Sequence, residues 1–153
     1  MKLLRVDMGT ERIQSEDVDE HYALLGGRGL VSALLSAELD PACDPEGPDN
    51  MLIICNGLMA GTLAASSGRL SVGGKSPLTG TIKESNAGGT AGLALARLGL
   101  RGIVVSGVSR ELKVLVVGPE GARLEEASEL ALRGTYDACD RLRARYGAGV
   151  SII

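Results

Sequence analysis

Residues 67–92 read SGRLSVGGKSPLTGTIKESNAGGTAG, the stretch that most constrains the fold and function of this sequence. It holds a disproportionate share of the 22 glycines and three cations, Arg69, Lys75 and Lys83. Glycine weakens ordinary helices and strands because it loses more backbone entropy on folding than other residues do. A backbone that presses closely against a bound molecule, however, benefits from missing side chains. The neighbouring cations and hydroxyls indicate an anionic, oxygen-rich ligand, with phosphate as the first candidate.

Residues 81–90 are the strongest chemical candidate, because they are typical of a strand, a glycine-rich loop and the start of a helix. The first turn of a helix leaves N–H groups unpaired and partly positive. Gly88 and Gly89 lack the side chains that would keep a phosphate away. Ser85 and Asn86 would then cap the helix or face the ligand. The structural alternative is a plain strand-to-helix turn with an asparagine cap.

Gly74-Lys75-Ser76 invites comparison with a mononucleotide P-loop, but its context fails. The pattern needs a glycine five residues before Gly74, where Arg69 stands, and a helix directly after the serine. Turn residues follow instead, so we reject a P-loop. Arg69 itself follows a flexible loop and suits bidentate phosphate binding, with an exposed surface arginine as the alternative.

The composition favours one domain with an aliphatic core. The 153 residues are 44% hydrophobic, yet there is no Trp, no Phe and only three Tyr. Few aromatics and a net charge of −3 without a basic stripe argue against a nucleic-acid partner. Three widely spaced cysteines form neither a disulfide framework nor a zinc site, which predicts reduced thiols in the cytoplasm. No apolar run predicts a signal peptide or a membrane span.

The pattern of apolar and turn residues predicts a mixture of strands and helices. Strands are expected at residues 3–6, 11–18, 51–55, 69–72, 79–83, 103–106, 112–117, 122–126 and 150–153. Helices are expected at residues 19–25, 29–39, 89–98 and 135–146, and a surface loop at 40–50. The apolar run 51–55 predicts a strand buried on both faces. The closing run 150–153 has no turn after it, so we expect a piece of something longer or a subunit edge that a partner covers.

Two further features have structural interpretations. His21, the only histidine, lies at an acidic helix start, so we expect a solvated or capping residue rather than a catalyst. Gly26-Gly27-Arg28-Gly29 lies between two expected helices. It predicts a tight corner in which the arginine interacts with the C-terminal end of a helix dipole.

Several motifs stand in order along the chain. They are LGGRGL at 25–30, GLMAGT at 57–62, SGR at 67–69, KSPLTG at 75–80, and SNAGG at 85–89 followed by Gly92. Together they closely resemble the N-terminal domain of the tungsten-containing aldehyde ferredoxin oxidoreductase family, over essentially the whole chain. The resemblance implies an α+β fold with two β-sheets and a few packed helices. It also implies a bis-pyranopterin cofactor whose dithiolenes hold tungsten, or molybdenum in some relatives.

The resemblance implies roles for individual residues. Arg69 matches the family arginine that contacts the pterin cofactor, and Asn86 and Gly88 match its asparagine and glycine at the cofactor. Ala87 lies between them and completes the expected cofactor-binding set. In the family the asparagine also offers its backbone carbonyl to a magnesium ion that bridges the two pterin phosphates. No catalytic residue is implied within this chain.

The resemblance also implies what the rest of the enzyme would supply. Residues 1–153 would be a single pterin-binding domain, truncated at its C-terminal end and inactive alone. The missing part would carry the cysteine ligands of a [4Fe-4S] cluster, and the whole enzyme would oxidise an aldehyde to a carboxylic acid and reduce ferredoxin. The expected partners are those C-terminal domains or a separate subunit carrying the cysteines, ferredoxin, the aldehyde and a further copy in a homo-oligomer.

Two alternatives to the enzyme interpretation stay open. In the first alternative, the chain is a non-catalytic binding module of the same fold, which stands alone or is one subunit of a split enzyme. In the second alternative, it is a phosphate- or nucleotide-binding domain unrelated to pterin. Neither a membrane nor a nucleic acid is expected as a partner.

Overall fold

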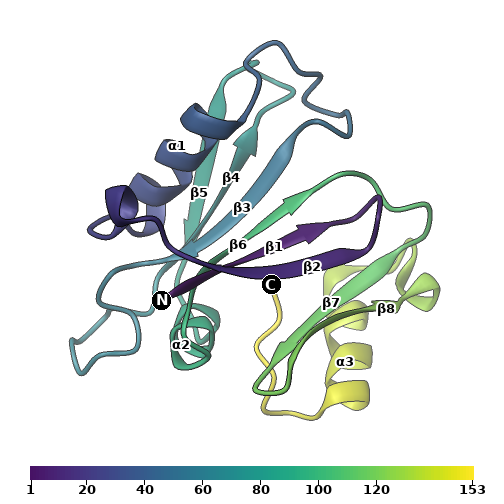
Figure 1. The fold of residues 1–153 in the computed structure, drawn as a ribbon. Helices are drawn as coiled ribbons and strands as arrows, with labels where there is room; N and C mark the ends of the chain where they lie inside the picture. The colour runs from purple at the N-terminus through teal and green to yellow at the C-terminus, as the bar shows by residue number, and fades with distance from the viewer. The chain divides into compact units, whose positions relative to one another are not determined.

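A computed structural model describes all residues from 1 to 153, and the chain divides into two compact units, residues 1–108 and 109–153. The strands are β1 (Lys2–Asp7), β2 (Arg12–Asp17), β3 (Met51–Asn56), β4 (Leu70–Lys75), β5 (Ile82–Ala87), β6 (Leu100–Ser106), β7 (Lys113–Gly118) and β8 (Gly121–Glu126) (Figure 1). The helices are α1 (Gly27–Glu38), α2 (Ala91–Arg97) and α3 (Thr135–Tyr146), with short 3₁₀ turns at Glu20–Tyr22 and Ser128–Leu130. Two sheets with a few helices confirm the predicted α+β class.

The first unit is built on a six-stranded sheet with the order β2-β1-β6-β3-β4-β5. Strands β1 and β6 run parallel, and all the other neighbours run antiparallel. Helix α1 packs on one face, over β3, β4 and β5 (Figure 1). Strands β2 and β5 are therefore the two free edges of the sheet, and β5 is the edge that carries the predicted site.

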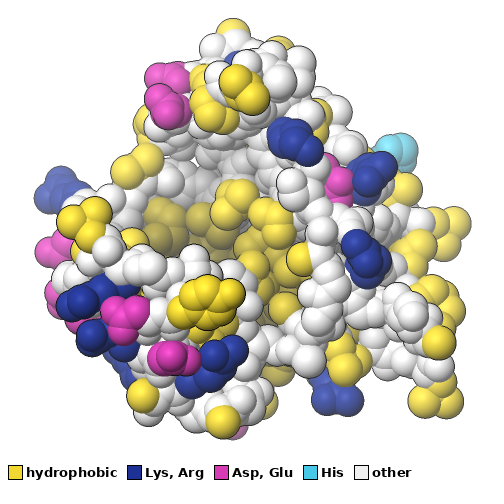
Figure 2. All heavy atoms as spheres, turned by 180° about the vertical axis from the view of Figure 1, so that it is seen from behind, with side chains coloured by type: hydrophobic (Ala, Val, Ile, Leu, Met, Phe, Trp, Pro, Cys, Tyr) yellow, Lys and Arg dark blue, Asp and Glu magenta, His cyan; other side chains and the backbone are white.

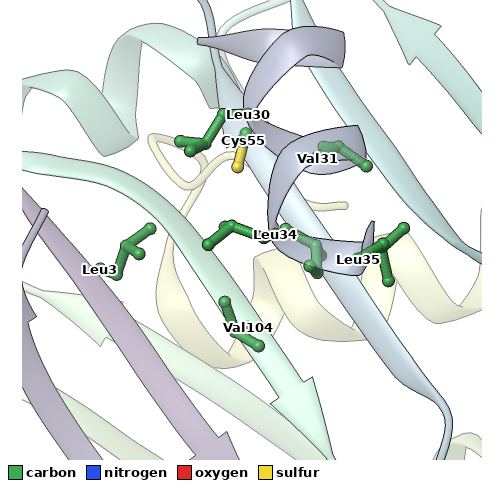
Figure 3. Packing of buried hydrophobic residues seen from close by; sticks show 8 residues of the cluster. Leu3, Leu30, Val31, Leu34, Leu35, Cys55 and Val104 are labelled. Atoms are coloured by element: carbon green, nitrogen blue, oxygen red, sulfur yellow. The ribbon is translucent and has the colours of Figure 1, made fainter. Parts of the chain in front are cut away.

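The core of this unit lies between α1 and the sheet. Leu30, Val31, Leu34 and Leu35 form the buried side of the helix (Figure 3). They pack against buried side chains of the sheet, namely Leu3, Ile53, Cys55 and Val104. Burying one such aliphatic side chain contributes about 1.5–3 kcal/mol. This aliphatic packing holds α1 on the sheet.

Several glycines of residues 67–92 serve packing within the chain rather than a ligand. A Cβ built on Gly73 would lie 2.5 Å from Val31 Cγ1 and 2.9 Å from the Lys83 carbonyl oxygen. One on Gly92 would lie 2.7 Å from the Gly68 carbonyl oxygen. At Gly88 nothing lies within 4 Å. Only part of the glycine enrichment is therefore available to explain a bound molecule.

The second unit pairs a hairpin with one helix. Strands β7 and β8 form a two-stranded antiparallel sheet. Tyr146 donates a hydrogen bond from its hydroxyl to Glu125 Oε2 at 2.8 Å, and Arg145 forms an ion pair with the same carboxylate. These contacts hold the C-terminal turn of α3 on β8.

Some predicted elements are wrong. Residues 150–153 form no strand, since the apolar run pairs with no other strand and apolar composition alone does not specify a partner. Strand β3 is not buried on both faces: Ile53 is fully buried beneath α1, whereas Leu52 is 46% exposed. Figure 2 shows both hydrophobic and charged side chains at the surface, with basic and acidic ones interspersed. No helix is long and apolar enough to span a bilayer.

Candidate functional site

The structure brings together Arg69 and Asn86, two residues of the predicted site. Arg69 directly precedes β4, and Asn86 lies opposite Ser71 in the antiparallel pairing of β4 with β5. The Arg69 Nε donates a hydrogen bond to Asn86 Oδ1 at 2.7 Å. Both side chains are exposed. A guanidinium held through one nitrogen keeps its two terminal nitrogens available for a ligand oxygen.

The predicted position of Asn86 in a strand-to-helix turn is wrong. Ser85 and Asn86 lie within β5, whose ladder with β4 continues through Ala87. Helix α2 begins later, at Ala91, and Thr90 at its N-cap position makes no side-chain cap hydrogen bond. Both residues pair with β4 as part of the strand, so neither residue caps a helix. The side chain of Asn86 instead orients Arg69.

The exposed turn follows Asn86 rather than containing it. Ala87, Gly88 and Gly89 are all exposed, and Cβ atoms built on either glycine would meet nothing within 4 Å. Gly89 has a φ of +118°, a conformation that side chains rarely adopt. A Cβ on Gly68 would lie 3.1 Å from the Gly89 carbonyl oxygen, so the main chain before Arg69 and this turn are side by side. An open main chain thus lies next to an exposed guanidinium.

A second group on the same strand was missed by the sequence analysis. Arg28 donates from Nε to Glu84 Oε2 at 3.0 Å. The Glu84 side chain is only 9% exposed, and its Oε1 makes no hydrogen bond of ordinary geometry. The adjacent Ser71 hydroxyl, and then the Arg28 guanidinium and the Lys83 charge, hold the pKa of Glu84 below its usual value against the opposing effect of burial. Glu84 is therefore a half-buried, ionised carboxylate two residues before Asn86 on the same strand.

Arg28 does not take the role expected from the sequence. It lies in the first turn of α1, which begins at Gly27 with a φ of +51°, and not at the C-terminal end of a helix. We name Arg28, Arg69, Ser71, Glu84 and Asn86 the α1–β5 cluster. The only sequence signal for Glu84 was its spacing of two residues from Asn86, which places both on one face of a strand.

The cysteines play no part in this cluster. Burial raises the pKa of the Cys55 thiol to about 12, although the nearby Arg101 charge lowers it. No group of three or more His, Cys, Asp or Glu side chains in the chain could hold a metal ion.

Two more polar side chains are buried without complete hydrogen bonding. Asn56 on β3 donates to the Leu100 carbonyl oxygen at 2.9 Å, but its Oδ1 has no partner. Arg101 on β6 is 9% exposed, and its Nε and one terminal nitrogen have no partner. No motif marked either residue in the sequence. They lie outside the α1–β5 cluster and add nothing to its chemistry.

The family model described as the aldehyde ferredoxin oxidoreductase N-terminal domain matches residues 3–153. The chain belongs to this family. The tungsten-containing aldehyde ferredoxin oxidoreductases of Pyrococcus furiosus and Thermococcus kodakarensis are each 40% identical to it over 131 residues. That alignment covers 84% of this chain and 22% of each relative, so the chain spans about a fifth of their length.

A solved structure has a fold similar to that of this chain. It is the active site complex BamBC of benzoyl coenzyme A reductase in complex with 1,5-dienoyl-CoA. The TM-score is 0.90 with 29% sequence identity, over 94% of this chain and 22% of that chain. Family membership and the α+β fold predicted from the motifs are both confirmed.

Proposed function

We propose that this chain is the cofactor-binding N-terminal part of a tungstopterin oxidoreductase that oxidises aldehydes to carboxylic acids and passes the electrons to ferredoxin. Family membership and the names of the relatives at 40% identity support the enzyme class. The single observation that supports the binding role is the Arg69–Asn86 hydrogen bond beside the exposed main chain of residues 87–89.

The residues present fit an anionic, oxygen-rich cofactor. The terminal nitrogens of Arg69 would bind a phosphate oxygen, and the open backbone at Ala87 and Gly88 would allow a close approach that side chains would prevent. Asn86 would fix the guanidinium in place and offer its backbone carbonyl to a magnesium ion. When bound, a tungsten or molybdenum bis-pyranopterin supplies the redox chemistry. The chain itself binds, orients and neutralises charge, and we assign it no catalytic residue.

Other parts of the proposed enzyme would lie outside this chain. The thiols of Cys43 and Cys55 are buried, and Cys139 is half-buried on α3. None of them is proposed as a ligand of the [4Fe-4S] cluster. Further domains or a separate subunit would hold the cluster and the second half of the pterin site, and ferredoxin would receive electrons there. We place the enzyme in the cytoplasm, where free thiols remain reduced.

The test uses the protein together with the domains or subunit that complete it. Bound tungsten and pterin are quantified by mass spectrometry and by the fluorescence of the oxidised pterin. Arg69→Gln removes the charge next to the open turn and is expected to lower cofactor content several-fold. Arg12→Gln, on the opposite sheet edge, is the matched control and should retain it. An Arg69→Gln protein with the cofactor content of the control would contradict the proposed site.

Activity separates the enzyme from a non-catalytic module. The completed protein should reduce a viologen dye when an aldehyde is added, and this chain alone should not. Cofactor binding without aldehyde-dependent dye reduction would favour the non-catalytic module. A completed protein that is stabilised by ATP and not by pterin would favour a nucleotide-binding domain.

A further inference from the structure

One cation of the first unit lies within the sheet rather than at its edge. Arg101 is the second residue of β6, the strand that lies between β1 and β3, and it is only 9% exposed. Arginines are almost never fully buried in proteins unless they are paired. An enclosed arginine in the middle of a six-stranded sheet therefore requires an explanation.

An irregularity in the pairing of β6 with β1 occurs at this position. The register passes from Leu100 opposite Lys2 to Gly102 opposite Leu3, so Arg101 is an extra residue without a partner on β1. Such bulges turn a side chain out of the regular alternation of a strand, and they are over-represented next to functional sites. The backbone thus gives Arg101 a direction that a regular strand would not.

The Arg101 charge has no counter-ion within this chain. Its Nε and one terminal nitrogen are enclosed and have no hydrogen-bond partner, so no carboxylate of the chain is bonded to either nitrogen. Burial raises the pKa of the Cys55 thiol and the Arg101 charge opposes that rise, which places the charge near a fully buried group. The unpaired Oδ1 of Asn56, on the adjacent strand β3, is a neutral acceptor and could not compensate a charge. A buried charge without a partner is strongly unfavourable.

The partner that fits Arg101 is a carboxylate side chain. A guanidinium binds a carboxylate through two parallel N–H···O hydrogen bonds. A free anion from solvent is disfavoured, because the two unpaired nitrogens have no exposed surface. A side chain on a segment that packs against the sheet can instead be brought to Arg101 as the segment docks. Most of the polypeptide of each tungsten-containing relative lies beyond the 22% that this chain matches.

We propose that Arg101 is the buried half of an ion pair whose carboxylate, from an aspartate or a glutamate, belongs to the domains or subunit that complete this protein. The inference rests on the proposed function, which requires such a completing part, and it adds a docking contact outside the proposed cofactor site. Because the pair forms only on assembly, the arginine destabilises this chain alone and stabilises the completed protein.

The test compares one substitution in two forms of the protein. Arg101→Met removes the charge and keeps a long apolar side chain. In this chain alone it is expected to raise the melting temperature by about 5 °C, because an uncompensated buried charge is removed. In the completed protein it is expected to lower the melting temperature by about 5 °C, because the partner carboxylate is left unpaired. Arg12→Met on the exposed edge strand β2 is the matched control and should change the melting temperature by no more than about 2 °C in either form.

Only opposite shifts in the two forms support the ion pair. If Arg101→Met lowers the melting temperature of this chain, the arginine is already satisfied within it, and the inference is overturned. If the melting temperature of the completed protein rises or stays unchanged, no carboxylate of the completing part reaches Arg101, which also overturns it. In that case, stabilisation of the wild-type chain by sodium acetate over sodium chloride at matched ionic strength, absent in Arg101→Met, would identify a free carboxylate as the occupant.

Cofactor content separates this inference from the proposed function. Bound tungsten and pterin in the completed protein measure the proposed function, and Arg101 is not part of that site. Opposite shifts in a completed protein that holds no pterin would support the ion pair and contradict the proposed cofactor site. A completed protein that holds the cofactor without showing opposite shifts would contradict the ion pair alone.

Discussion

Gly73 offers the sharpest test of which glycines in residues 67–92 serve packing. We expect Gly73→Ala to destabilise the protein, because the added Cβ would lie 2.5 Å from Val31 Cγ1 and 2.9 Å from the Lys83 carbonyl oxygen. Ordinary van der Waals contact begins at 3.4 Å, so the overlaps are 3.4 − 2.5 = 0.9 Å and 3.4 − 2.9 = 0.5 Å. The first neighbour is a fully buried β-branched side chain with restricted rotamers, and the second is backbone of β5.

The magnitude follows from two opposing effects. Overpacking a dense core costs about 1–3 kcal/mol, and two simultaneous overlaps put this site at the upper end. Replacing glycine by alanine within a strand returns about 0.5–1 kcal/mol of backbone entropy. The net expected loss in the free energy of unfolding is about 2 kcal/mol. Gly88→Ala should change the free energy of unfolding little, since nothing lies within 4 Å of the Cβ position there.

Urea denaturation followed by circular dichroism measures both variants. The loss should appear as a lower midpoint with an unchanged dependence on urea. In a Val31→Ala background, Gly73→Ala should cost less, because one of its two overlaps is removed. If Gly73→Ala is as stable as Gly88→Ala, the packing explanation is refuted, and Gly73 would have to be explained by a ligand after all.

Three further predictions concern stability and reactivity. Cys55, with a pKa of about 12, should resist thiol reagents at pH 8 until the protein unfolds. The half-buried Cys139 should react before it, and the reverse order would show that Cys55 is not buried in solution. Because the pKa of Glu84 is lowered on folding, its contribution to stability is complete above the ordinary glutamate pKa and is lost as pH falls through the lowered value. Denaturation midpoints measured across acidic pH should therefore decline less in Glu84→Gln than in the wild type. Leu34→Ala should cost about 2–5 kcal/mol in urea denaturation, since Leu34 is 1% exposed in the core; a smaller loss would mean that α1 packs loosely.

The sequence predicted the elements whose pattern is local. The apolar spacing of residues 29–39 predicts a helix, and the structure has one at Gly27–Glu38. The glycine that follows residues 135–146 marks the end of a second predicted helix, which the structure has at Thr135–Tyr146. The run 150–153 failed, because strand formation depends on a partner strand that apolar composition does not specify. Family membership was predicted correctly because it depends on ordered motifs rather than on any one element.

The site was predicted only in part for the same reason. Arg69 and Asn86 were recognised, and the structure joins them by a hydrogen bond. Arg28 and Glu84 are 56 positions apart in the chain, and only the register of β4 with β5 and the packing of α1 bring them together. Neither the register nor the packing is encoded in a short motif. The roles of Ala87 and Gly88 at a cofactor remain predictions.

The parallel pairing of β1 with β6 has a consequence for how this domain folds during synthesis. Strand β1 can pair early with β2, which follows it directly, but its other neighbour extends to Ser106. Until β6 has been translated, β1 therefore presents an unpaired side to the cell. Such distant pairing slows folding and exposes nascent chains to aggregation. Chaperones that bind short extended segments would have their longest opportunity at this N-terminal hairpin.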